Sequence, residues 1–157
     1  YMSAGKLVPD DLVLRMLEER LAQPDARGGF LLDGFPRTIP QAEALLQLSP
    51  LDRVISFDIP PDVLVERLGQ RRMCPTCQSV YNLATQLPKT PGKCDRDGAV
   101  LVQRPDDLPQ AIATRLEVYR RQTAPLLEFY RSRSLLRPID AVGTPSEVAG
   151  RIRTALG

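Results

Sequence analysis

Apolar positions along the chain follow two periods, and their alternation predicts an α/β fold. Short runs of consecutive apolar residues, typical of buried parallel strands, stand at 30–32, 53–58 and 135–140. Apolar residues that return every three or four positions, as in amphipathic helices, stand at 10–22, 39–48, 61–72, 108–130 and from 145 onward. Strands that alternate with helices predict a parallel sheet, although three strands are few for such a sheet.

Two helices carry a capping box at their start. Thr38 is expected at the N-cap of the second helix, with Gln41 reaching back to it. Thr144 and Glu147 predict the same arrangement for the last helix, where a proline suits the first helical position. Pro125 predicts a break or kink in the long helical stretch around it.

Helical periodicity disappears over 73–103, where proline, glycine and cysteine appear with only short β-like pieces. We interpret this stretch as a small inserted subdomain. The expected organisation is a core formed by 9–72 and 104–157, interrupted by the insertion. The chain opens on Tyr1-Met2 with no strand before its first helix, so we expect further strands to be missing at the amino end.

Composition narrows the class of protein. The 157 residues carry a net charge of only +2 and no apolar stretch of membrane-spanning length, so we expect a cytoplasmic protein without a nucleic-acid or membrane partner. The sequence contains no histidine, which excludes histidine as general base or metal ligand. Phosphoryl transfer depends on positioning and charge stabilisation more than on an acid or base, and it is compatible with that absence.

The three cysteines all lie in the insertion and form the most specific local signal. Cys74 and Cys77 make a C-x-x-C knuckle, and Cys94 with Asp97 repeats its spacing. Three thiolates and one carboxylate would complete a tetrahedral structural zinc site. Metal binding contributes roughly 10 kcal/mol to the folding of such a unit. The alternatives are a redox C-x-x-C motif, expected at a helix start, and a disulfide, disfavoured by the odd cysteine number.

The apolar run at 30–32 ends in residues that suit a ligand site. In open α/β sheets, ligands bind at the carboxyl ends of the strands. Asp33 could hold a metal-bound water there, Gly34 lets a ligand approach the backbone, and Arg37 can fork onto a phosphate. The alternative is that the Asp-Gly and Phe-Pro pairs only make a turn.

Four further arginines flank the insertion. Arg67 and Arg71 are four positions apart, so we expect them on one face of a helix. Arg104 marks the exit from the insertion, and Arg115 lies on the following helix. Taken singly, each is a solvated surface arginine, whereas jointly with Arg37 they would converge on a polyphosphate.

The motifs that combine these features are G-K-L-V-P-D (Gly5–Asp10), G-F-L-L-D-G-F-P-R-T (Gly29–Thr38), R-x-D-D (Arg104–Asp107) and the stretch Arg115–Leu126. With the arginine-flanked zinc knuckles they resemble a bacterial long-form adenylate kinase over essentially the whole chain. The resemblance implies a P-loop nucleoside-monophosphate-kinase-like core, with residues 73–103 as a zinc-binding lid and residues 1–8 as the remnant of an AMP-binding domain. It implies a monomer that converts ATP and AMP into two ADP with Mg²⁺.

The resemblance also assigns site residues. Those that would line AMP are Lys6, Leu7, Val8, Gly34, Phe35, Pro36, Arg37 and Gln41. Gln41 would face the adenine, a role that we favour over its capping role, and Asp33 would orient magnesium through water. Those that would grip the phosphates or ATP are Arg67, Arg71, Arg104, Arg115, Val80 and Tyr81. Gly143 would touch the ATP base through its carbonyl.

Three features depart from the family pattern. The 157 residues contain no G-x-x-x-x-G-K-[ST] phosphate loop, and Gly5-Lys6 does not supply one. The lid entry R-L-G-Q-R-R displaces its glycine, and Pro105 stiffens the lid exit. We therefore expect this polypeptide alone to transfer phosphate poorly. The competing functions are a non-catalytic nucleotide-binding remnant and a zinc-ribbon nucleic-acid-binding module, which would need aromatic and basic residues near the knuckles.

Overall fold

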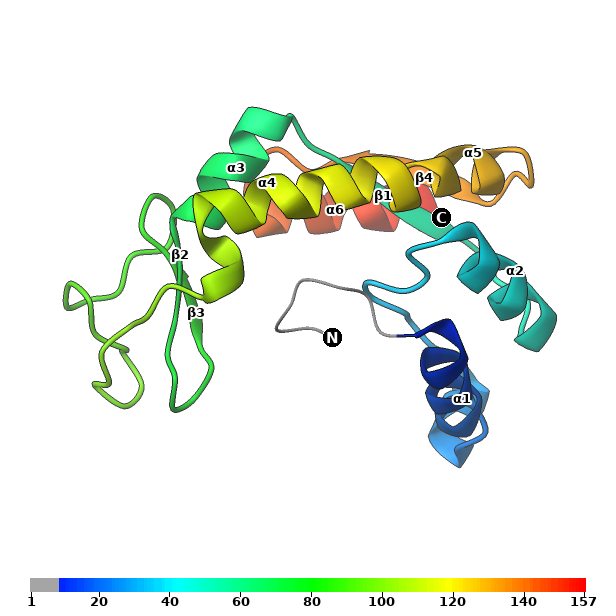
Figure 1. The fold of residues 1–157 in the computed structure, drawn as a ribbon, viewed down its shortest axis with the longest axis horizontal. Helices are drawn as coiled ribbons and strands as arrows, with labels where there is room; N and C mark the ends of the chain where they lie inside the picture. Colours follow the sequence, from blue (N-terminus) through cyan, green and yellow to red (C-terminus); the bar gives the residue numbers. More distant parts are fainter. Residues whose placement is uncertain (1–8) are drawn as a thin grey trace. The chain divides into compact units, whose positions relative to one another are not determined.

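The computed structural model describes residues 9–157, and their contacts form two compact units (Figure 1). The first unit runs to Asp58 and resumes over Glu117–Gly157, while the second is Ile59–Leu116. The insertion expected at 73–103 lies within the second unit, and its boundaries stay a prediction. No helix in the described part of the chain is long and apolar enough to cross a membrane.

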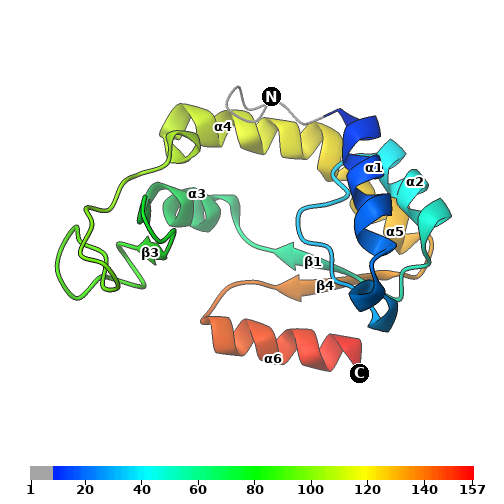
Figure 2. The same ribbon diagram turned by 90° about the horizontal axis from the view of Figure 1, so that it is seen from below.

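A parallel pair of strands organises the first unit. β1 (Val54–Asp58) pairs with β4 (Leu136–Asp140) in a register that runs from Val54 opposite Leu136 to Asp58 opposite Asp140. Figure 2 shows the two strands side by side, with α6 (Pro145–Leu156) beside β4. The strands predicted at 53–58 and 135–140 and their parallel pairing are thus confirmed.

The strand predicted at 30–32 is wrong. Residues 30–32 make no strand ladder, and no segment between residues 9 and 157 pairs with them. Phe30 is 39% exposed and Leu31 is 84% exposed. An apolar run becomes a strand only when a neighbour satisfies its backbone groups. β1 and β4 satisfy each other instead.

The first unit also contains helices, which supply most of its buried core. They are α1 (Asp10–Leu21), the short 3-10 helix Pro24–Gly28, α2 (Ile39–Leu48), α5 (Pro125–Arg131) and α6. α2 packs on α1 and α5 (Figure 2). The buried cluster consists of Ala42, Leu126, Tyr130 and Leu136.

The two predicted capping boxes differ in the structure. Thr144 and Glu147 form the complete reciprocal box at the start of α6. At α2, the Thr38 hydroxyl accepts a hydrogen bond from the Gln41 N–H. The Gln41 side chain reaches back one residue further than predicted, to the backbone N–H of Arg37. The reciprocal half of that box is therefore absent.

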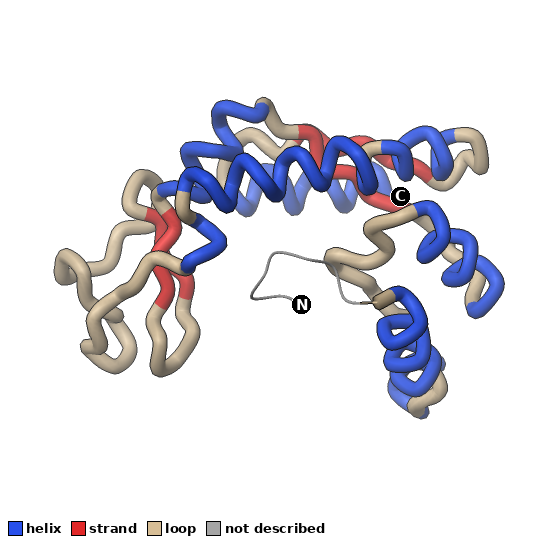
Figure 3. The backbone as a smooth tube through the Cα atoms, in the orientation of Figure 1, coloured by secondary structure: helices blue, strands red, loops and turns tan. Residues whose placement is uncertain are grey.

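The second unit is built mainly of loops and turns (Figure 3). Its regular elements are α3 (Pro61–Gly69), β2 (Arg71–Met73), β3 (Val80–Asn82), the 3-10 turn Pro105–Asp107 and α4 (Pro109–Val118). The prediction that the helix after Pro60 runs to about Arg72 is wrong. α3 ends at Gly69, a poor helix former, and the next residues pair antiparallel with β3.

The kink predicted near Pro125 is present. The α-helical path of α4 ends at Val118, and the π-helical turn Tyr119–Thr123 precedes α5. Proline lacks the N–H that would continue the ladder, and a wider turn absorbs the irregularity.

The hydroxyl of Tyr130 gives a first testable prediction. Tyr130 is 2% exposed, and its hydroxyl has no hydrogen-bond partner among the described residues. Burial raises the pKa of Tyr130. Because a buried unpaired hydroxyl carries a desolvation cost, we expect Tyr130→Phe to raise the free energy of unfolding by about 1 kcal/mol. Urea unfolding measures this.

The matched control for that substitution is Tyr119→Phe. Tyr119 is 44% exposed, so its hydroxyl stays in water and the change is expected to lie within about 0.5 kcal/mol. A loss of stability in Tyr130→Phe beside a neutral control would contradict the expectation.

Candidate functional site

The segment after residue 32 folds into a turn that positions Arg37. Gly34 has φ +75°, and a Cβ there would lie 3.1 Å from the Arg37 guanidinium. The peptide between Phe35 and Pro36 is cis. Arg37 Nε donates to the Gly34 carbonyl at 2.7 Å, and the rest of its exposed guanidinium stays open to an anion. The segment forms a turn, and that turn is compatible with the predicted ligand site.

A chain of hydrogen bonds through the buried Gln41 holds the backbone of Arg37 in place. Gln41 is 3% exposed, and its side-chain oxygen accepts from the Arg37 N–H at 2.7 Å. Its side-chain nitrogen donates to Asp10 at 2.6 Å. The Thr123 hydroxyl donates to the Arg37 carbonyl at 3.0 Å. Sequence reasoning missed Asp10 and Thr123, because their partners lie far along the chain.

In the second unit, three predicted arginines gather around two carboxylates. Arg71 forms a fork on Asp107, with Nε at 2.8 Å and Nη2 at 2.5 Å from the two carboxylate oxygens. Arg115 lies 3.4 Å from an oxygen of each carboxylate, and Arg104 lies 2.9 Å from Asp106. We call this set the arginine–carboxylate cluster. Hydrogen bonds to Asp107 raise the pKa of Arg71 above its ordinary value.

The cluster leaves one positive charge in excess, since three guanidiniums face two carboxylates. Asp107 is fully buried, whereas the side chain of Arg71 is 25% exposed. The carboxylates thus hold the arginines in place and leave part of each arginine side chain exposed. Sequence reasoning gave neither acid this role, because Asp107 is 36 residues from Arg71.

Arg67 and Arg71 lie in different elements. Arg67 belongs to the last turn of α3, and its carbonyl accepts from the side chain of Asn82 at 3.1 Å. Arg71 lies in β2, beyond the end of the helix. The prediction that these two arginines share one helical face is therefore wrong.

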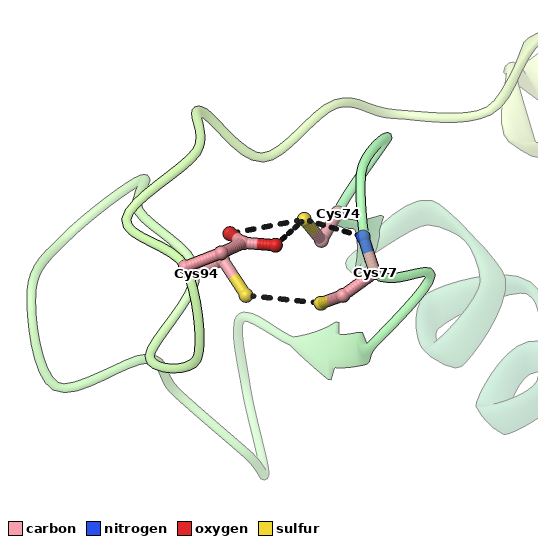
Figure 4. Close-up of side chains that lie close together, drawn as sticks. Cys74, Cys77 and Cys94 are labelled. Carbon is pink, nitrogen blue, oxygen red and sulfur yellow. Dashed lines mark hydrogen bonds between the residues drawn. The ribbon is translucent and has the colours of Figure 1, made fainter.

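The four predicted metal ligands come together in the second unit. One ligand atom each from Cys74, Cys77, Cys94 and Asp97 lies within 4.8 Å of the others. We call these residues the Cys3Asp cluster. Figure 4 shows the cysteine side chains pointing toward one another, with the Cys77 and Cys94 sulfurs 3.5 Å apart. Cys74 and Cys94 are buried and share a small core with Tyr81 and Leu101.

The electrostatics of the Cys3Asp cluster suit a divalent cation. The N–H of Ala99, followed by the thiols of Cys74 and Cys77, lowers the pKa of Asp97 to about 2. That carboxylate is thus an anion at neutral pH. A hydrogen bond from Tyr81 lowers the pKa of Cys94, whereas burial raises that of Cys74. Three sulfurs and one oxygen at this spacing fit tetrahedral zinc.

The remaining predicted residues lie in several places. Val80 is 52% exposed on β3, and the neighbouring Tyr81 is 6% exposed. Gly143 has φ +119°, and a Cβ there would meet a Glu147 oxygen at 2.7 Å. Asp33 is exposed at the start of the turn before Arg37. The predicted AMP-lining residues Lys6, Leu7 and Val8 lie outside the described residues.

Fold and sites together define a class: an α/β protein with a parallel strand pair, a cysteine-knuckle unit in the chain between the two strands, and arginines oriented by nearby carboxylates. A family model described as adenylate kinase matches residues 1–135. The adenylate kinase of Moorella thermoacetica is 48% identical over 162 residues, which cover 100% of this chain and 75% of that protein.

Two further relatives agree. The adenylate kinase of Carboxydothermus hydrogenoformans is 47% identical over 161 residues, with 99% of this chain and 75% of that protein covered. That of Bacillus subtilis is 43% identical over 162 residues, with 100% and 75% covered. The chain belongs to the adenylate kinase family.

Proposed function

We propose that this chain serves the reversible transfer of a phosphoryl group between ATP and AMP, which yields two ADP. The observation that carries the proposal is the similarity to adenylate kinases along essentially the full chain. Phosphoryl transfer requires positioning and stabilisation of negative charge. The arginine-bearing turn of the first unit and the arginine–carboxylate cluster of the second suit both tasks.

On the AMP side, Arg37 would bind the phosphate through the guanidinium edge that Gly34 does not occupy. The backbone from Gly34 to Pro36 would form the wall of the site, together with Lys6, Leu7 and Val8. Gln41 would recognise the adenine. Its amide is already bonded to Asp10 and to the N–H of Arg37, so this role requires it to exchange a partner or to act through that chain.

On the ATP side, the arginines of the second unit would neutralise charge on the transferring phosphoryl group. These residues are Arg67, Arg71, Arg104 and Arg115. Val80 and Tyr81 would contact ATP from β3, and Gly143 would meet its base through the main-chain carbonyl. The lid at 73–103 would close over the nucleotide and exclude water, which favours transfer over hydrolysis.

Two metal ions belong to the proposal. Mg²⁺ accompanies ATP in adenylate kinases, and Asp33 would orient it through water while it screens phosphate charge. Zinc would be the structural ion of the lid, held by Cys74, Cys77, Cys94 and Asp97. Its contribution is to crosslink two loops that share only a small core.

The proposal includes a monomer acting in the cytoplasm without a nucleic-acid or membrane partner. The relatives named above are all adenylate kinases, which favours this function over a zinc-ribbon module. Tyr81, an aromatic residue on β3 next to the knuckles, is 6% exposed and offers no face on which a base could stack.

Removal of the Arg37 guanidinium tests the AMP side. We expect Arg37→Ala to weaken AMP binding at least about tenfold, because a charge-assisted bidentate contact contributes roughly 1.5–3 kcal/mol. Isothermal titration calorimetry of the 157-residue chain with AMP measures this. Arg53→Ala, on the same unit and also exposed, is the matched control and is expected to leave AMP affinity unchanged. AMP binding that is equally strong in Arg37→Ala would contradict the proposed site.

A coupled ADP-forming assay on the same 157-residue chain tests the role of the phosphate loop. We expect AMP to bind while turnover stays near background, because no residue of this sequence provides the G-x-x-x-x-G-K-[ST] cradle. Native-like turnover would overturn this expectation.

A further inference from the structure

Two hydroxyl groups lie against two of the three cysteine sulfurs, and neither belongs to a predicted metal ligand. The Ser79 hydroxyl is 3.1 Å from the sulfur of Cys77. The Tyr81 hydroxyl is 3.5 Å from the sulfur of Cys94. Each sulfur therefore has a neighbouring O–H group that can donate to it in the thiolate form.

The geometry of β3 places both hydroxyls on one side. Ser79 directly precedes the strand, and Tyr81 is its middle residue, so the two side chains point to the same face. Val80 between them points the other way and is 52% exposed, whereas Tyr81 is 6% exposed. Backbone pairing of β3 with β2, which leads directly into Cys74, keeps this face turned toward the Cys3Asp cluster.

With a metal ion bound, the Cys3Asp cluster would carry excess negative charge, which the two hydroxyls can stabilise by donating hydrogen bonds. Three thiolates and one carboxylate carry four negative charges, and a divalent cation offsets two of them. Part of this excess negative charge would be buried, since Cys74 and Cys94 are buried. Hydrogen-bond donors around a metal site spread such charge and orient its ligands.

Backbone N–H groups supply only some of the hydrogen bonds to the cysteine sulfurs. The N–H of Cys77 lies 3.4 Å from the Cys74 sulfur, and the N–H of Arg96 lies 3.4 Å from the Cys94 sulfur. The Ser79 hydroxyl lies 3.1 Å from the Cys77 sulfur, closer than the Cys94 sulfur at 3.5 Å. The side-chain hydroxyls thus complete the set of donors, one on each of two sulfurs.

We propose that Ser79 and Tyr81 are positioning residues of the metal site, whose hydroxyls donate to the Cys77 and Cys94 thiolates and set how tightly the cluster binds its divalent ion. This inference rests on the proposed zinc site. It gives Tyr81 a role through its hydroxyl that is separate from the contact with ATP proposed for this residue.

Zinc affinity is the first measurement. In competition with a chromophoric chelator, we expect Tyr81→Phe and Ser79→Ala each to weaken zinc binding by about tenfold or more. Phenylalanine keeps the buried ring, so the packing around Leu101 is retained. The matched controls are Tyr119→Phe and Thr114→Val, whose hydroxyls contact no cysteine sulfur, and both are expected to bind zinc as the wild type does.

The spectrum of the Co²⁺-substituted chain separates a positioning role from a merely structural one. The Tyr81 hydroxyl also accepts from the Asp95 N–H at 2.8 Å, so its loss could weaken the knuckle without any effect through the sulfur. A hydrogen bond stabilises the sulfur lone pairs that donate into the metal. Its removal is therefore expected to shift the sulfur-to-cobalt charge-transfer band to longer wavelength in both variants.

The outcomes discriminate the two proposals. Weaker zinc binding with a red-shifted band in both variants supports the inference. Unchanged affinity, or weaker affinity with an unshifted band, overturns it and leaves the zinc site intact. A wild-type chain that binds neither Zn²⁺ nor Co²⁺ overturns the zinc site and this inference together.

Discussion

Cys94→Ser is expected to abolish tight zinc binding and to unfold the loops between Cys74 and Leu101. These loops share a core of four buried residues, of which Cys74 and Cys94 are two. A core of this size does not offset the chain entropy of the loops. We therefore expect a bound metal to supply most of their stability, on the order of 10 kcal/mol for a structural zinc site.

Metal analysis by mass spectrometry and amide hydrogen exchange check this expectation. Exchange protection of the Cys94 and Leu101 N–H groups, which donate within these loops, should disappear. Protection of β1 and β4 should persist, because their core is a separate cluster. Wild-type chain treated with a chelator should behave as Cys94→Ser does, and Thr114→Val should behave as the untreated wild type. Full protection of these loops without metal would contradict the expectation.

Asp107→Asn is expected to lower the free energy of unfolding by about 3 kcal/mol. Asp107 is fully buried, and its carboxylate receives both arms of the Arg71 fork and a longer contact from Arg115. Asparagine keeps the shape but removes the charge, so a partly buried guanidinium loses its counter-ion. Breaking a buried pair by removal of one partner costs about 3–5 kcal/mol, and the lower end applies because Arg71 is partly exposed.

Asp106→Asn is the matched control for that substitution. Asp106 pairs with Arg104 and Arg115, but its side chain is 42% exposed, and solvent screens such pairs. We expect a loss of about 0–1 kcal/mol. Urea unfolding of the zinc-loaded chain compares the two variants. Equal and small losses would show that Asp107 is not the anchor of the arginine–carboxylate cluster.

The sequence predicted correctly those features that depend on residues close together in the chain. The strands at 54–58 and 136–140 follow from apolar runs that must be covered, and the complete box at Thr144 follows from side chains three positions apart. The Cys3Asp cluster was predicted for the same reason, since each knuckle aims two ligands at one point over four residues.

Interactions between residues far apart in the chain could not be predicted from local sequence patterns. The fork of Arg71 on Asp107 joins residues 36 apart, and the bond of Gln41 to Asp10 joins residues 31 apart. Neither pairing follows from the hydrophobic periodicity or from the spacing within a motif. The strand predicted at 30–32 is absent for a related reason. Apolar residues favour a buried strand, but a strand forms only where a neighbouring strand pairs with its backbone, and no described strand pairs with residues 30–32.

The parallel pairing of β1 with β4 has a consequence for the order of folding during synthesis. Residues 59–135 separate the two strands, and they contain the whole second unit as one continuous stretch. That stretch leaves the ribosome before β4 does, so the second unit can fold while β1 still lacks its partner. The first unit must wait until Leu136–Asp140 emerges, which makes its closure a late, long-range event.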